Sequence, residues 1–132
     1  LRGNGRLEGG ITLGPLLPFA ERLAPRRDGG LIADRVLRWK FAAGPLQPDY
    51  IWVDIGDEQG NTWELMLRGS QNKLRLPVLP HGVIGLGRPG LYHAQITAVT
   101  NPRFNFDNFS YLDTWFMSWQ ALSERNVSFR LD

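Results

Sequence analysis

The sequence contains no cysteine. This absence excludes disulfide bonds, thiol catalysis and thiolate metal sites together. The chain also has no run of roughly 18 or more apolar residues, the length that a membrane-spanning helix requires. We therefore expect no transmembrane segment.

Clustered positive charge is lacking as well. The net charge is +2, and Arg26-Arg27 is the only adjacent pair of basic residues. A nucleic-acid-binding surface gains its affinity by neutralising several phosphates at once, which requires clustered cations. The composition therefore predicts that nucleic acid is not a partner.

Signals of catalysis and of cofactor binding are equally sparse. The chain has two histidines, His81 and His93, and their spacing does not match a zinc motif. No serine lies in a G-x-S-x-G elbow. The stretch "GLGRPG" at 85–90 matches G-x-G-x-x-G, but a predicted strand follows it where a dinucleotide site requires a helix. We therefore expect a connecting loop there, no enzymatic activity and no cofactor.

The chain itself has the size and composition of one globular domain. It has 132 residues, of which 42% are hydrophobic and 21% are charged. The 15 glycines and 9 prolines favour many turns and few long helices.

Alternation of apolar and polar residues is the strongest pattern in the sequence. In 50–55, for example, Ile51, Val53 and Ile55 alternate with Tyr50, Trp52 and Asp54. Such alternation is typical of strands with one buried face. The segments that show it are 35–41, 50–55, 62–68, 73–76, 91–100 and 126–131. Turn residues separate them at roughly ten-residue spacing, which favours an all-β, antiparallel sandwich.

The N-terminal part is less regular. We interpret residues 1–24 as a linker or an edge strand and residues 25–132 as the sandwich domain, with an insertion at 100–125. Because the chain begins at Leu1 and not at methionine, we expect it to be processed or cut from a longer polypeptide.

Several segments, taken in order, resemble a fibronectin type III module over roughly residues 25–131. They are Pro25 leading to "LRW" with Trp39, "YIWVDI" at 50–55, "LPVLP" at 76–80, "GLYHAQITAV" at 90–99 and "RNVSFRL" at 125–131. The resemblance implies a seven-stranded, immunoglobulin-like sandwich with Trp39 and Tyr92 in its core and with Tyr92 near a corner between the sheets. The chain departs from the family in the longer loop before Tyr92 and in the segment 100–125. It has no Arg-Gly-Asp, so integrin binding is not implied.

Two groups of acidic and amide residues are candidate calcium ligands, because calcium prefers oxygen ligands. One group is Asp54, Asp57 and Glu58, and the other is Asp107, Asn108 and Asp113. Neither has EF-hand spacing, and Asp and Asn are also common turn residues. We expect turn chemistry and no metal site, with calcium at the second group as the alternative.

The stretch "FNFDNFSYLDTWFMSWQ" at 104–120 contains seven of the chain's fifteen aromatic residues. Leu112, Trp115, Phe116, Trp119 and Leu122 recur with helical spacing, which predicts a helix near 111–123. The structural interpretation is that this insertion covers an end or edge of the sandwich. The alternative interpretation is that part of the insertion is exposed and contacts a partner, because aromatic residues are enriched at interfaces.

Three functional hypotheses follow from the aromatic insertion. The first is a non-catalytic structural or protein-interaction module of an exported protein or assembly. Its partner-binding residues would be Phe109, Tyr111, Trp115, Phe116 and Trp119. The second is a carbohydrate-binding module that uses Trp115, Trp119 and Trp52. The third is a peripheral subunit of a membrane-protein complex. We expect an extracytoplasmic location (periplasmic, cell-surface or secreted).

Overall fold

The structure is a computed structural model that describes residues 16–80, 83, 85–110 and 119–132. Within these ranges the regular structure consists of eight strands and no helix. The strands are β1 (Ala20–Ala24), β2 (Gly30–Leu31), β3 (Val36–Phe41), β4 (Tyr50–Asp57), β5 (Thr62–Arg68), β6 (Lys73–Arg75), β7 (Gly90–Thr100) and β8 (Ala121–Leu131).

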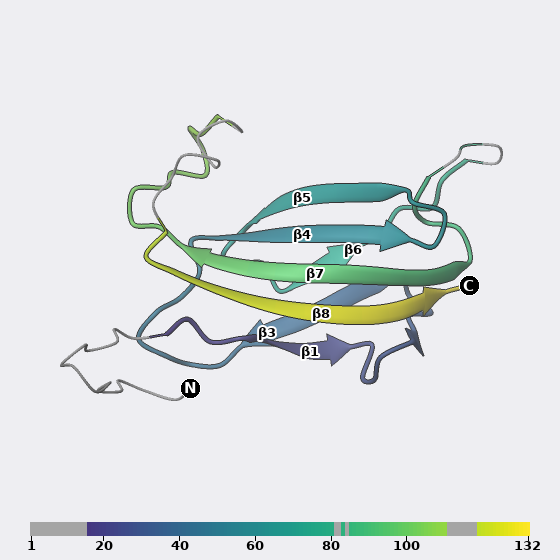
Figure 1. Cartoon of the computed structure of the whole chain (residues 1–132), viewed down its shortest axis with the longest axis horizontal. Helices are drawn as coiled ribbons and strands as arrows, with labels where there is room; N and C mark the ends of the chain where they lie inside the picture. The colour runs from purple at the N-terminus through teal and green to yellow at the C-terminus, as the bar shows by residue number, and fades with distance from the viewer. Residues whose placement is uncertain (1–15, 81–82, 84, 111–118) are drawn as a thin grey trace.

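The strands form two sheets that lie in two layers (Figure 1). One sheet has the order β1-β3-β6, and the other has the order β2-β8-β7-β4-β5. Neighbouring strands are antiparallel except β2 and β8, which are parallel. The prediction of an all-β, sandwich-like fold is confirmed at this level.

Alternate side chains of both sheets meet in one hydrophobic core. Trp39 of β3 is 0% exposed, and it shares the core with Ile51 and Val53 of β4 and Phe129 of β8. The apolar sets predicted from alternation in β3 and β4 therefore face inward, while Trp52 and Asp54 lie on the outer face of the five-stranded sheet. Burial of the inner set is the main stabilising contribution to the fold.

Most of the predicted strands are found close to their predicted bounds. The segments 62–68 and 91–100 correspond to β5 and β7, and 50–55 lies within β4. β1 lies at the edge of the three-stranded sheet, where the sequence predicts a first strand. The short β2 was not predicted, because two residues are too few to show a period.

The prediction of a helix near 111–123 is wrong for its C-terminal part. β8 begins at Ala121 and not at Asn126, and Leu122 pairs with Val99 of β7. Before it, the Gln120 N–H donates a hydrogen bond to the Thr100 carbonyl at 2.9 Å. Pairing along the whole of β7 outweighs the local helical spacing, since tertiary context overrides weak propensity. Residues 111–118 of the predicted helix lie outside the described residues.

The buried Tyr92 holds the loop before β7 in place through two hydrogen bonds of its hydroxyl. Its hydroxyl donates to the Arg88 carbonyl at 2.7 Å and accepts from the Gly87 N–H at 3.0 Å, and its ring stacks on Phe129. Tyr92 is thus in the core, as predicted. Residues 85–89 form a loop, and β7 follows from Gly90, so the prediction of a loop before a strand is confirmed.

Replacing Tyr92 with phenylalanine is expected to lower the free energy of unfolding by about 1–3 kcal/mol, because it leaves the buried Gly87 N–H without its acceptor. Urea unfolding of both proteins measures this difference. Ser128→Ala is the control, since it removes a hydroxyl from the surface and should cost less than about 0.5 kcal/mol. Equal losses in the two variants would contradict a stabilising role for the Tyr92 hydroxyl.

Candidate functional site

An aromatic cluster covers one end of the outer face of the five-stranded sheet. It consists of Tyr50 from β4 and three phenylalanines, Phe104, Phe106 and Phe109, from the loop after β7. The centroid of the Phe104 ring lies 4.4 Å from that of Tyr50 and 5.1 Å from that of Phe109. Tyr50 is only 1% exposed although it lies on the outer face. The first part of the aromatic segment therefore packs on the sheet. For these residues, this agrees with the structural interpretation, in which the insertion covers part of the sandwich.

Polar contacts hold this loop against the strands. The Arg68 guanidinium lies 4.6 Å from the centroid of the Phe106 ring and forms an ion pair with Asp107. That ion pair lowers the pKa of the Asp107 carboxyl below its ordinary value. At the start of the loop, the Asn101 N–H donates to the Asp49 carboxylate at 2.6 Å. The cluster is thus attached to β5 and to the residue that precedes β4.

A groove of about 580 Å³ lies beside the aromatic cluster on the same outer face. Two indoles, Trp52 from β4 and Trp119 from just before β8, contribute its largest side chains. The lining residues are Tyr50, Trp52, Asp54, Glu64, Gln95, Thr97, Val99, Trp119, Leu122 and Glu124. Trp119 is 54% exposed, so its indole is available to a partner.

Both indoles are positioned by hydrogen bonds. The Trp52 Nε1–H donates to the Asp54 carboxylate at 3.0 Å. The Trp119 indole hydrogen-bonds the Tyr50 hydroxyl. Burial raises the pKa of Tyr50, while the bond from Trp119 lowers it and the charge of Asp49 raises it. Held side chains lose less conformational entropy on binding, which favours affinity.

The groove is acidic in a chain of net charge +2. Among the described residues, Asp54, Glu64 and Glu124 line it with carboxylates, and no lysine or arginine does. Asp54 and Glu64 face each other across β4 and β5. Burial raises the pKa of Asp54 above its ordinary value, the hydrogen bond from Trp52 lowers it, and the charge of Glu64 raises it. Because the neighbouring carboxylates of Asp54 and Glu64 carry the same charge, a ligand with a cationic group would bind favourably between them.

A second hollow of about 470 Å³ continues the groove along the sheet. It shares Asp54, Glu64 and Gln95 with the groove, and His93 and Ser128 line its far part. The outer face therefore changes along the strands from aromatic to acidic, and then to a part that His93 and Ser128 line.

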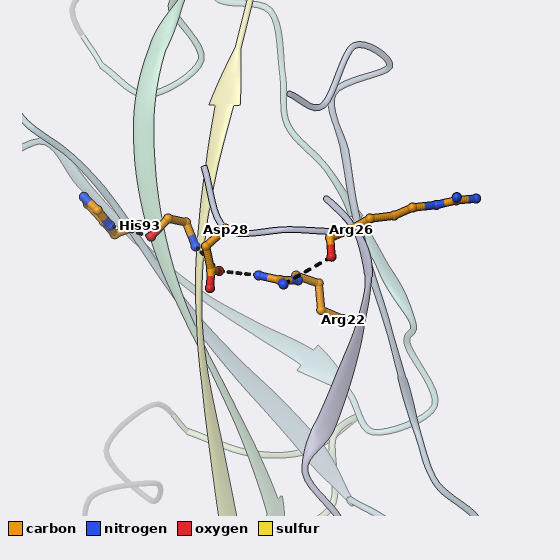
Figure 2. A network of polar contacts seen from close by, with 5 residues as sticks. Arg22, Arg26, Asp28 and His93 are labelled. Atoms are coloured by element: carbon orange, nitrogen blue, oxygen red, sulfur yellow. Dashed lines mark hydrogen bonds and ion pairs between the residues drawn. The ribbon is translucent and has the colours of Figure 1, made fainter. Parts of the chain in front are cut away.

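Figure 2 shows the polar network at the far part of this face. The Ser128 hydroxyl lies 3.1 Å from His93 Nδ1, and the Ser128 N–H donates to Asp28 at 3.4 Å. Asp28 also pairs with Arg22, which donates to the Arg26 carbonyl at 3.2 Å. A Ser-His-Asp relay needs the carboxylate on the imidazole. Here Asp28 contacts a backbone N–H and a guanidinium, so the network joins β1 to β8 and lacks that arrangement.

The acidic groups considered for calcium are described except for Asp113, which lies outside the described residues. Asp57 and Asp107 make turn and surface contacts. Asp57 accepts from the Asn61 side chain and from the backbone N–H groups of Gln59 and Asn61, which lowers its pKa. Asp107 pairs with Arg68. Within the described residues, no group of three or more His, Cys, Asp and Glu side chains is arranged to hold a metal ion.

Two of the five predicted partner-binding residues are described. Phe109 is half-buried in the aromatic cluster, and Trp119 lines the groove. Tyr111, Trp115 and Phe116 lie outside the described residues. Trp52, predicted to lie opposite Ile51 and Val53, does so and joins Trp119 in the groove.

The acidic part of the groove was not predicted from the sequence. Alternation places Asp54 beside Trp52, but Glu64 and Glu124 come from β5 and β8, and only the strand order brings them to the same face. No protein-family model matches the chain, and no curated protein matches its sequence.

Proposed function

We propose that this chain is a non-catalytic interaction module of the fibronectin type III-like kind, which binds a protein partner through the groove at Trp52 and Trp119. The observation that carries the proposal is the groove itself, in which two positioned indoles border a hollow with three carboxylates. Tryptophan is among the residues that contribute most to binding at protein interfaces.

The strand order supports the family part of the proposal. β1, β3 and β6 form one sheet, and the remaining strands form the other, with the last two strands adjacent. The burial of Trp39 and Tyr92 matches what the resemblance implies. The hydrogen bond that the Tyr92 hydroxyl donates back to the Arg88 carbonyl is typical of the tyrosine corner of such sandwiches.

The chemistry of the groove indicates what the partner presents. The indole faces favour apolar or cationic groups, because an aromatic ring attracts a cation over its face. The carboxylates favour cations as well. A segment carrying lysine or arginine therefore suits the groove better than an acidic one does.

A carbohydrate is the second candidate ligand, because Trp52 and Trp119 lie with carboxylates and an amide, Gln95, in one groove. Aromatic faces stack on sugar rings, and acidic and amide groups accept and donate hydrogen bonds to hydroxyls. Binding to glycans in the absence of protein would favour this function over the first.

A peripheral place in a membrane-protein complex, at an extracytoplasmic location, is the third proposal. No helix of the described residues is long and apolar enough to cross a membrane. In this proposal the groove would contact a membrane-embedded protein and not lipid, because its carboxylates would be repelled by anionic headgroups.

The test is capture of partners from soluble and membrane extracts by the wild-type domain and by Trp119→Ala. Once a partner is identified, its affinity for the variant should fall at least about tenfold if Trp119 is a main contact. Phe19→Ala is the matched control, because Phe19 is 63% exposed and lies outside the groove. Equal binding by all three proteins would reject the groove as the docking site.

A further inference from the structure

A hollow lined by two arginines lies at the end of the fold opposite the aromatic cluster. Its volume is about 590 Å³, and its lining residues are Arg35, Val78, Leu79, Pro80, Val83, Gly87, Arg88, Pro89 and Asp132. In Figure 1 the loop between β6 and β7 lies at the same end as the last residue of β8, and the loop after β7 lies at the other end. Among the described residues, the hollow and the groove have no lining residue in common, so they are separate sites.

Arg35 reaches the hollow from a strained backbone conformation. Its φ is +57°, in the left-handed region, which costs free energy for a residue with a Cβ atom. Two backbone hydrogen bonds hold it there. The Arg35 N–H donates to the Ile32 carbonyl at 3.1 Å, and the Arg35 carbonyl accepts from the Leu76 N–H at 2.8 Å. Because residues held in such conformations are concentrated at ligand-binding sites, Arg35 is a candidate for a binding role.

The Arg35 guanidinium donates to main-chain oxygens on three sides. Its Nη2 donates to the Pro77 carbonyl at 3.0 Å and to the Gly87 carbonyl, and its Nη1 donates to the main-chain oxygen of Asp132 at 3.4 Å. Its Nε is buried and has no acceptor. These contacts explain how the side chain joins the loop to the end of β8. Among the described residues, however, no carboxylate side chain pairs with it.

Arg88 brings a second guanidinium to the hollow. Its Nη2 donates to the Val83 carbonyl at 2.7 Å. In the part of the chain that the structure describes, the ion pairs of basic side chains are formed by Arg22, Arg38, Lys40 and Arg68. Neither Arg35 nor Arg88 is among them. Since a guanidinium has five N–H groups, each of the two keeps donors for a ligand.

The remaining lining residues define what kind of anion fits. Asp132 supplies one carboxylate against the two guanidinium groups, so the described lining has an excess of positive charge, unlike that of the groove. Two apolar side chains on its wall, Val78 and Val83, are 75% and 42% exposed. Covering them with an apolar group would remove that surface from water.

We propose that this hollow binds an acidic segment of a protein partner, in which a carboxylate contacts Arg35 and Arg88 and a neighbouring apolar side chain covers Val78 and Val83. Arginine forms strong, frequently bidentate contacts with carboxylates. The exposed valines favour a peptide over a free inorganic anion, which would bury no apolar surface against them. The proposal is independent of the groove, whose carboxylates favour a cationic ligand.

Selection from a library of displayed random peptides tests the proposal, because it does not require the natural partner to be known. The peptides enriched on the wild-type domain should include a class with aspartate or glutamate beside apolar residues. Peptides rich in lysine or arginine that depend on Trp119 would belong to the groove, so the two proposals can fail separately. Absence of an acidic class would overturn the proposal made here.

Arg88→Gln tests the contact with one selected acidic peptide as the probe. We expect the dissociation constant to rise at least about fivefold, and to rise similarly when the acidic residues of the peptide are replaced by their amides. The substitution keeps the Arg88 carbonyl, which accepts from the Tyr92 hydroxyl, so the loop should stay folded. Arg103→Gln is the matched control, because it removes the same charge from an exposed position beyond the opposite end of β7. Equal weakening by both variants would indicate general charge attraction and would overturn the proposal.

Nuclear magnetic resonance locates the bound peptide. On addition of the acidic peptide, the backbone amide signals of Val78, Val83 and Gly87 should shift, while the indole signal of Trp119 should not. Shifts confined to the groove would place the peptide there and overturn the proposal. Equally tight binding of inorganic phosphate at the hollow would show that an anion alone suffices, and would overturn the assignment to a protein segment.

Discussion

Replacing Trp39 with alanine is expected to lower the free energy of unfolding by about 3–5 kcal/mol. Trp39 is fully buried between the sheets, and its indole N–H donates to the Gln71 carbonyl at 3.0 Å. The substitution leaves a large cavity and an unpaired carbonyl. A domain of this size has about 5–15 kcal/mol of stability, so the variant should be close to unfolding at ambient temperature.

Chemical denaturation of the wild type and the variant measures this loss. Trp119→Ala is the control, because it removes the same side chain from a position that is half-exposed and outside the core. It should cost less than about 1 kcal/mol. A comparable loss at both positions would contradict the assignment of Trp39 to the core and of Trp119 to the groove.

The strands could be predicted wherever one face is buried, because apolar and polar residues then alternate along the sequence. β4 and β7 are examples, since both have the core on one side and the outer surface on the other. The same argument fails at the start of β8. Trp119 and Leu122 fit both helical spacing and a path along β7, and only the continuous pairing from Thr100 to Gly90 decides between them.

The groove was predictable only in part, for a topological reason. Local alternation shows that Trp52 and Asp54 share a face, and that a tryptophan-rich segment follows β7. It does not show that Glu64 and Glu124 reach the same face, because this depends on β5 and β8 lying on opposite sides of β4 and β7. Charge complementarity between a surface and its ligand is thus set by strand order, which short-range patterns do not encode.

Gly69→Ala is the second substitution for which we expect a large loss. Gly69 follows β5, and its N–H donates to the Asp49 carbonyl at 3.0 Å. A Cβ atom built on it would lie 1.7 Å from the Pro48 carbonyl oxygen and 2.5 Å from the Pro48 carbonyl carbon. Both are backbone atoms, so relief requires the chain before β4 to move away from the end of β5. We expect a loss of about 3 kcal/mol or more in the free energy of unfolding.

Gly60→Ala is the control, because it measures the stability lost when a glycine is replaced without a collision of the added methyl group. Gly60 has φ +84°, which an alanine adopts with strain, but no heavy atom lies within 4 Å of the added methyl group. The cost there should be about 1 kcal/mol. Urea unfolding of both variants therefore compares conformational strain alone with backbone collision. If Gly69→Ala lost no more stability than Gly60→Ala, the close approach of residues 48–49 to Gly69 would be wrong. The register of β5 against β4 would then be in question as well.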